Sequence, residues 1–245
     1  MLIKNTDFKR LAESIDKLPV MFIASIEQHG PFLPLGTDTL IAEALSERLE
    51  QRMGDKVILL PTLPFGCSKE HKGFPGTISL ECSTYISLIK EITSSIFDVG
   101  FDQMLVVSTH GGNNAVMRVI QNECNYGNKK KLGFLVAFDE EVDKKCQELF
   151  GGSEMHAGSS ESSIIAALDP KNVGFIGTRS NPKFAPHQEG VFSLFSTKEI
   201  TRLGILNFSP KLEIDPEKGK QLLEFIADNL VQKLKKLTGR MLKDG

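Results

Sequence analysis

Short runs of consecutive apolar residues alternate along the chain with longer segments in which apolar residues recur every three or four positions. The short runs predict buried strands at residues 20–24, 57–60, 104–108 and 132–138. The periodic segments predict helices at residues 40–53, 82–99, 114–125 and 140–150. Residues 155–163 are predicted to form the opening of another helix, and a last one begins at Pro216. Uninterrupted apolar strands between amphipathic helices indicate an α/β fold with a mainly parallel sheet covered on both faces.

The chain has 245 residues, which is enough to bury a large core. No internal repeat or low-complexity linker divides it, so we predict a single domain over residues 1–245. The pattern is weak between residues 173 and 210, where a second small domain remains an alternative.

The charged residues nearly balance, with 29 Lys and Arg against 31 Asp and Glu and a formal net charge of −2. This balance gives no indication of a nucleic-acid or membrane partner. No run approaches the roughly 20 apolar residues of a membrane span, and the first residues lack the apolar segment of a signal peptide. The four cysteines are scattered without a Cys-x-x-Cys pair, which is typical of reduced thiols. We therefore expect a soluble, cytoplasmic protein.

Candidate metal ligands follow the first predicted strand. Glu27 and His29 are two residues apart, so on an extended backbone their side chains point to the same side. Asp38 comes after a loop rich in Gly and Pro and just before a predicted helix. Open α/β sheets carry their chemistry at the carboxyl ends of the strands, and these three residues leave the end of one strand.

Further candidates follow later elements. His110 comes directly after the strand at 104–108, and His156 and Glu161 flank a loop–helix junction. Five residues then offer three carboxylates and two imidazoles as ligands: Glu27, His29, Asp38, His110 and Glu161. This mixture suits zinc or manganese, and five ligands can serve two ions if one carboxylate bridges them.

Each candidate also has a structural explanation when taken alone. Asp38 is placed to cap a helix, Glu161 to complement a helix dipole, and His110 to bond a backbone carbonyl in a turn. His156 fits a core histidine equally well. Their shared position at the ends of core strands is what favours a site. The chain lacks the glycine-rich nucleotide motifs and the Gly-x-Ser-x-Gly nucleophile motif of other chemistries.

Four ordered segments resemble those of the creatininase family of metal-dependent amidohydrolases. Residues 27–38 begin Glu-Gln-His-Gly-Pro, residues 70–77 run from Glu-His to Gly-Thr, residues 109–113 read Thr-His-Gly-Gly-Asn, and residues 156–163 begin His-Ala-Gly. Residues 204–206 and 217–219 resemble a C-terminal segment of the family more weakly. The resemblance covers most of the chain.

The resemblance implies a three-layer α/β/α sandwich, a centre of two divalent metal ions, and hydrolysis of a non-peptide C–N bond in a small-molecule substrate. Zinc is expected, with manganese or iron as alternatives. A homo-oligomer is implied, and members of the family are commonly hexamers. The implied roles are one ion held by Glu27 and His110, a second held by His29 and Glu161, a bridge from Asp38, proton transfer by His156, and substrate contacts from His71, Gly111, Gly112 and Asn113.

Two departures from creatinine hydrolases bear on the substrate. Those enzymes carry a His-Tyr-Glu arrangement where this chain has Gly111 and Gly112 after His110. The His-Ala-Gly segment usually continues with Glu, where this chain has Ser159. Both departures disfavour creatinine, and the Gly-Gly form is more similar to formamidopyrimidine deformylases and peptide-maturation proteases. A non-catalytic metal- or ligand-binding protein is a further alternative.

Substrate specificity is expected to rest on two loops, residues 64–76 and 178–188. His187 and Glu189 lie at the end of the second loop, where a surface role is favoured over substrate contact. The sequence leaves the substrate itself open, because the shape of these loops has no simple sequence pattern.

Overall fold

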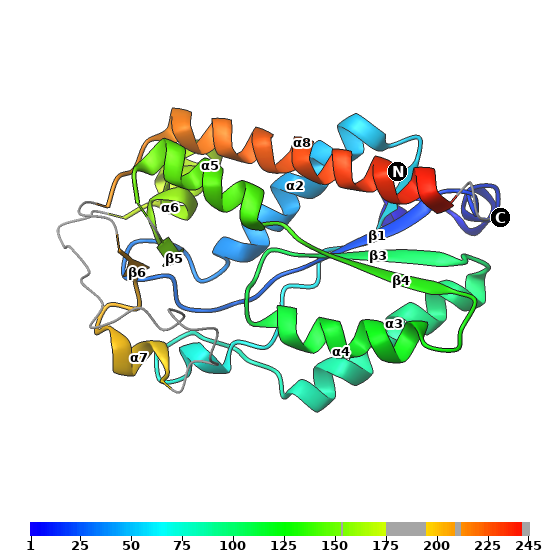
Figure 1. The fold of residues 1–245 in the computed structure, drawn as a ribbon, viewed down its shortest axis with the longest axis horizontal. Coiled ribbons are helices and arrows are strands. Elements are labelled where there is room, and N and C mark those ends of the chain that lie inside the picture. Colours follow the sequence, from blue (N-terminus) through cyan, green and yellow to red (C-terminus); the bar gives the residue numbers. More distant parts are fainter. Residues whose placement is uncertain (153, 175–194, 209–211, 242–245) are drawn as a thin grey trace.

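A four-stranded parallel sheet forms the centre of the molecule (Figure 1). The computed structural model describes residues 1–152, 154–174, 195–208 and 212–241. The strands lie in the order β2-β1-β3-β4, with bounds β1 Leu18–Ile23, β2 Val57–Leu59, β3 Gln103–Ser108 and β4 Lys131–Val136. Every pairing between them is parallel, as the uninterrupted apolar runs predicted.

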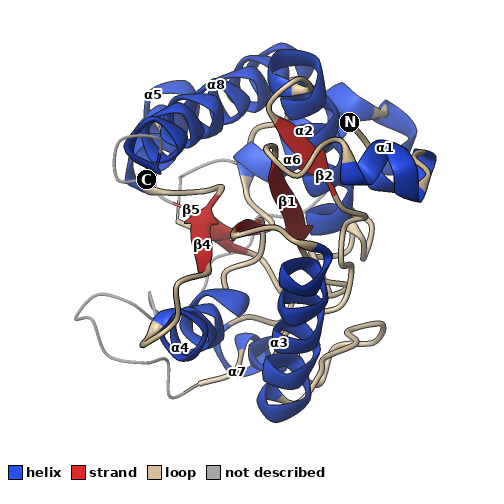
Figure 2. Cartoon of the chain, turned by 90° about the vertical axis from the view of Figure 1, so that its right-hand side faces the viewer, coloured by secondary structure: helices blue, strands red, loops and turns tan. Residues whose placement is uncertain are grey.

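Helices cover both faces of this sheet, so the fold is a three-layer α/β/α sandwich. One layer contains α2 (Thr37–Met53), α5 (Glu140–Phe150), α6 (Ser159–Leu168) and α8 (Pro216–Met241). The opposite layer contains α3 (Cys82–Val99) and α4 (Asn113–Asn125). Figure 2 shows the strands lying between the two helix layers. The predicted fold class is therefore confirmed.

Two apolar clusters lie on the two faces of the sheet. Successive side chains of β1 alternate between them, with Val20 and Phe22 in one cluster and Met21 and Ile23 in the other. Because all six residues of β1 are buried, the strand has no polar side. This explains why its sequence is a continuous apolar run rather than an alternating one.

Helix ends are set by local side chains. The carboxylate of Asp215 accepts hydrogen bonds from the backbone N–H groups of Glu217 and Lys218, and α8 begins at Pro216 as the sequence predicted. Asp139 caps α5 in the same way, and Gly151 ends it in the left-handed conformation, φ 69°.

Several short elements lie together near one end of the sheet, opposite to the short helix α1 (Phe8–Ala12). They are α7 (Thr197–Ile200), the strands β5 (Glu154–His156) and β6 (Leu206–Asn207), which pair antiparallel, and 3₁₀ turns that include Lys69–His71. The prediction that a helix opens at residue 155 is wrong in its first residues. Met155 lies in β5, and α6 starts only after Gly158. The partner of β5 lies some fifty residues further along the chain, so local periodicity gives no sign of the pairing.

The strand order reverses between β1 and β3. The chain moves from β1 to β2 on one side and from β3 to β4 on the other, so the loops after β1 and β3 diverge at the carboxyl edge. Open α/β sheets form their ligand crevice at such a point. Residues 178–188, with His187 and Glu189, lie outside the described residues. Among the described residues, no helix has the length and apolar character needed to cross a membrane.

Candidate metal centre

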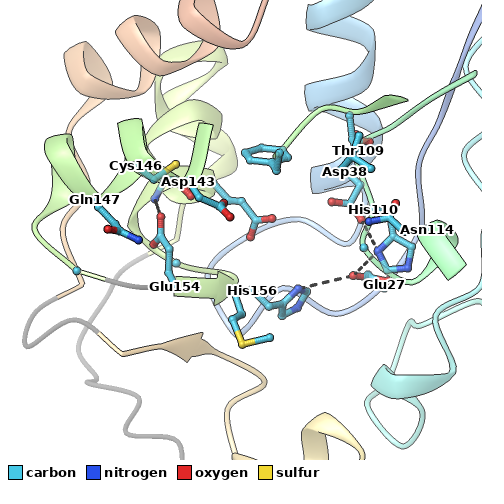
Figure 3. Close-up of a pocket in the computed structure, with 18 residues that line it drawn as sticks. Glu27, Asp38, Thr109, His110, Asn114, Asp143, Cys146, Gln147, Glu154 and His156 are labelled. Carbon is cyan, nitrogen blue, oxygen red and sulfur yellow. Dashed lines mark hydrogen bonds and ion pairs between the residues drawn. The ribbon is translucent and has the colours of Figure 1, made fainter. Parts of the chain in front are cut away.

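Five buried or nearly buried side chains converge at the reversal point. Ligand atoms of Glu27, Asp38 and His110 lie within 4.8 Å of one another, and so do ligand atoms of His29, Asp38 and Glu161. Asp38 belongs to both groups. Glu27 and His29 come from the segment after β1, Asp38 from the first turn of α2, His110 from the segment after β3, and Glu161 from the first turn of α6. The structure thus brings together all five ligand candidates, and Figure 3 shows Glu27, Asp38 and His110 side by side.

Each of the two histidines in these groups has one nitrogen bonded to the backbone and the other facing the carboxylates. His29 Nδ1 lies 3.2 Å from the carbonyl of Glu27, and its Nε2 lies 3.5 Å from Asp38 Oδ1. His110 Nε2 lies 2.9 Å from the carbonyl of Cys67, and its Nδ1 lies 3.3 Å from Asp38 Oδ2. Because a carbonyl only accepts, each backbone-facing nitrogen carries a proton, which leaves the inner nitrogen as the one whose lone pair a metal ion would take. This is the arrangement that orients an imidazole toward a metal.

Two of the three carboxylates, Glu27 and Asp38, are ionised despite their burial. Burial alone opposes ionisation, but His110 and His71 lower the pKa of Glu27, and His29 and His110 hold the pKa of Asp38 well below its usual range. Both Glu27 oxygens and His29 Nε2 are buried without a hydrogen-bond partner among the described residues. Buried polar atoms of this kind are expected to have a partner, and a divalent cation fits this donor set.

Glu161 is held by an unusual turn. Ala157 has φ 51°, which non-glycine residues seldom adopt, and in this conformation its N–H donates to Glu161 Oε2 at 2.6 Å. Burial raises the pKa of Glu161 to about 7. Ser159, where the resemblance led us to expect Glu, is fully buried and accepts a hydrogen bond from the N–H of Glu213. This position therefore serves to hold the segment before α8.

The surroundings of Gly112 bear on the other departure, the two glycines that follow His110. A Cβ at this position would lie 2.1 Å from the Cys67 carbonyl and 2.3 Å from Glu70 Oε1. Glu70 thus occupies the volume that a side chain at residue 112 would need, with Oε1 3.5 Å from His110 Nε2. Glu70 was not predicted as a site residue, although it is the neighbour of His71 in the resembling segment.

Two cavities reach the centre. One, of about 290 Å³, lies toward α5 and is lined by Asp143 and Glu154, and the other, of about 180 Å³, lies toward α7 and is lined by Phe195 and Ile200. Both are also lined by the set Glu27, His110, Gly111 and His156, while His71 and Gly112 line the smaller one. Asn113 lines neither. It is fully buried, and its amide bonds the backbone of Ala24 and Cys67.

His156 and His71 stack at the edge of the centre, with ring centroids 4.1 Å apart. Burial lowers the pKa of His71 to about 4, and burial together with the neighbouring imidazoles of His71 and His29 lowers the pKa of His156 well below its usual range. Both rings are therefore neutral at physiological pH. His156 Nδ1 lies 3.7 Å from Glu27 Oε1 (Figure 3). From this position the ring nitrogen is able to reach a molecule bound beside Glu27.

The family model for creatininase, described as creatinine amidohydrolase, matches residues 3–234. The chain belongs to the creatininase family. Creatinine amidohydrolase of Pseudomonas putida is 25% identical over 167 residues, which cover 60% of this chain and 63% of the relative. The family assignment agrees with the resemblance found in the sequence.

Other relatives in the creatininase family differ in the reactions that their names give. A mycofactocin precursor peptide peptidase of Mycolicibacterium smegmatis is 28% identical over 172 residues, covering 69% of this chain. The chain spans between 58% and 64% of the length of such peptidases. A deformylase of 2-amino-5-formylamino-6-ribosylaminopyrimidin-4(3H)-one 5'-monophosphate from Methanothermus fervidus is 23% identical over 239 residues, covering 93% of this chain and 87% of the relative.

Solved creatininase structures share the fold. The crystal structure of a creatinine amidohydrolase superposes with a TM-score of 0.79 at 20% identity and covers 96% of both chains. A creatininase structure that carries Mn in its name superposes with a TM-score of 0.78 at 19% identity, covering 96% of this chain and 97% of the other. At this identity the likeness establishes the architecture alone.

Proposed function

We propose that this chain is a metal-dependent amidohydrolase that binds two divalent ions. Zinc is the proposed metal. Glu27 and His110 would hold one ion, His29 and Glu161 the other, and Asp38 would bridge them. The observation that carries the proposal is the presence of Asp38 in both ligand groups. A carboxylate shared by two groups is the usual means of holding a metal pair. The proposed unit is a single domain over residues 1–245 that acts on a small molecule as a homo-oligomer.

When bound, the ions would activate a water molecule and polarise the carbonyl of the scissile C–N bond. His156 would deliver a proton to the leaving nitrogen. Its neutral ring would first take that proton from the attacking water. The accepting atom would be Nδ1, the nitrogen on the Glu27 side. Gly111 exposes its backbone at the centre, because a Cβ there would meet nothing within 4 Å. This leaves room for a substrate beside His110.

A loading and substrate experiment tests this function. We expect the zinc-loaded protein to retain about two ions per chain by elemental analysis, as a paired site requires, and to hydrolyse at least one member of a panel of formamides and cyclic amides. Glu27→Gln is expected to lower both readings, whereas Glu91→Gln, a change at an exposed position of α3, is the matched control. Two retained ions without hydrolysis of any member would instead indicate a non-catalytic metal-binding protein.

A peptidase is the second candidate function. The relatives at 28–30% identity are named as peptidases of a precursor peptide, and the two cavities leave space on both sides of Glu27, His110 and His156. An internal amide has groups on both sides of the scissile bond, whereas a formamide has only hydrogen on the carbonyl side. Peptide amides and matched formamides in the same panel separate the two functions.

The metal-free protein is expected to lose folding stability as pH rises from about 6.5 to about 10. Burial disfavours the charged ring of His29, but the nearby carboxylates, Asp38 above all, raise its pKa to about 10 from 6.5. A raised histidine pKa contributes stability that is complete below the unfolded value and lost as pH passes the folded value. In the metal-loaded protein the ion takes the Nε2 lone pair, so this loss is absent.

The measurement is thermal unfolding at several pH values with zinc or with a chelator. The gap in Tm between the two forms should widen from about pH 6.5 to about pH 10, the interval bounded by the two pKa values of His29. In the chelated protein, His29→Asn should reduce the dependence, and the part that remains belongs to His110, whose pKa the carboxylates of Glu27 and Asp38 also raise against the effect of burial. Parallel curves for the loaded and chelated forms would show that protons and metal do not compete for this ring.

A further inference from the structure

We propose that Gln28 is a positioning residue that determines which ring nitrogen carries the proton in His71 and in His156. Gln28 lies between two of the proposed ligands and is only 4% exposed. Its carboxamide nitrogen is 2.9 Å from His71 Nδ1 and also 2.9 Å from His156 Nε2. The consequence for catalysis rests on the proposed function, whereas the proton positions do not.

The orientation of the Gln28 carboxamide is fixed by two backbone groups. The N–H of Gly30 donates to Oε1 at 3.0 Å, and Nε2 donates to the carbonyl of Gly204 at 3.0 Å. Turning the amide over would place two donors against each other and two acceptors against each other. Gly204 has φ +76°, and a Cβ there would lie 1.7 Å from Oε1, so only glycine brings this carbonyl so close.

The tautomer of His156 follows from the backbone of Gln28. His156 Nε2 lies 2.7 Å from the Gln28 carbonyl, which accepts and never donates, so Nε2 carries the proton. It is then unable to accept from the Gln28 amide as well. The unprotonated nitrogen of His156 is Nδ1, on the side of Glu27 and the cavities.

The tautomer of His71 follows from the side chain of Gln28. One amide hydrogen goes to Gly204, and because His156 Nε2 is a donor, the other has only His71 Nδ1 as acceptor among the residues that the structure describes. A proton on Nδ1 would leave a buried amide N–H unpaired, which is costly. The hydroxyl of Thr197, 3.0 Å from the same nitrogen, is able to rotate and share the lone pair, so it does not require a proton on Nδ1. His71 therefore carries its proton on Nε2, and this N–H dipole, 3.3 Å from Glu27 Oε1, favours the present position of the carboxylate without forming a regular hydrogen bond.

Ring nitrogen NMR of the metal-free wild-type protein tests the tautomers directly. With [ring-¹⁵N]histidine, the chain gives signals from only five residues, which single substitutions assign. We expect both His71 and His156 to show a protonated Nε2 and a lone-pair Nδ1. A protonated Nδ1 in His71 would overturn the proposal, whether or not the protein binds metal or hydrolyses an amide.

The variant Gln28→Met tests the consequence for the centre. It removes the side-chain donor but keeps the Gln28 carbonyl, so the signals of His71 should change while those of His156 stay. Zinc affinity, measured by competition with a chelator, should fall about tenfold, as is typical when a group that orients a ligand is lost. Gln121→Met is the matched control, since it also removes a hydrogen bond from a side chain to a backbone carbonyl.

The outcomes separate the two proposals. Unchanged His71 signals and unchanged zinc affinity in Gln28→Met would reject the role of Gln28 while leaving the metal centre intact. Absence of zinc binding in the wild type would reject the proposed function, and the NMR result would still decide the tautomers. Should Gln28→Met fail to fold, the wild-type spectrum alone decides the assignment.

Discussion

Replacing Asp38 with Asn is expected to abolish metal binding and hydrolysis together. Asp38 is 2% exposed, its Oδ2 accepts from Ser25 Oγ at 2.5 Å, and its two oxygens face His29 and His110 respectively. Asparagine has the same shape but only one oxygen and no charge, so it is unable to bridge two cations. Loss of an ion forfeits several kcal/mol of transition-state stabilisation, which corresponds to at least about a 10³-fold fall in kcat/KM.

Elemental analysis after exhaustive dialysis and amide hydrolysis are measured on the same preparation. The matched control is Glu43→Gln, the same change of carboxylate to amide at an exposed position of α2. It should leave both readings unchanged. Retention of two ions by Asp38→Asn would exclude a bridging role for this residue, even if activity were lost.

Much of the fold is predictable because its determinants are local. The buried strands are continuous apolar runs, and helix ends such as Pro216 and Gly151 are set by residues beside them. The pairing of β5 with β6 was not predicted, because Glu154 and Asn207 meet only through the tertiary fold. Periodicity reports which side of an element is buried and gives no sign of contacts between distant short segments.

The candidate site was predictable to a similar degree. Residues that follow core strands, such as Glu27 and His110, were identified from position and residue type. Gln28 was missed because on an extended backbone it points away from its neighbours Glu27 and His29. Its importance arises from His71, 43 positions away in sequence, and from Gly204, 176 positions away. Contacts over such separations depend on the tertiary fold.

Replacing His156 with Ala is expected to separate proton transfer from metal binding. General acid–base catalysis by a positioned side chain contributes about 10²- to 10⁴-fold, so kcat should fall by that amount. The metal content should stay at the wild-type value, because His156 belongs to neither of the two groups that share Asp38. Added imidazole should restore part of the activity, since removal of the ring leaves a space beside Glu27 and His71 of matching shape.

A competing role for His156 makes this variant decisive. His156 also forms a group with Glu27 and His29 in which the ligand atoms lie within 4.8 Å of one another. If it were a ligand, His156→Ala would lose an ion, and imidazole would restore metal content and activity together. If it transfers a proton, imidazole restores activity at constant metal content. The low pKa of His156 agrees with either role, since a neutral ring is needed in both. Metal content in the presence and absence of imidazole therefore distinguishes them, and activity alone does not.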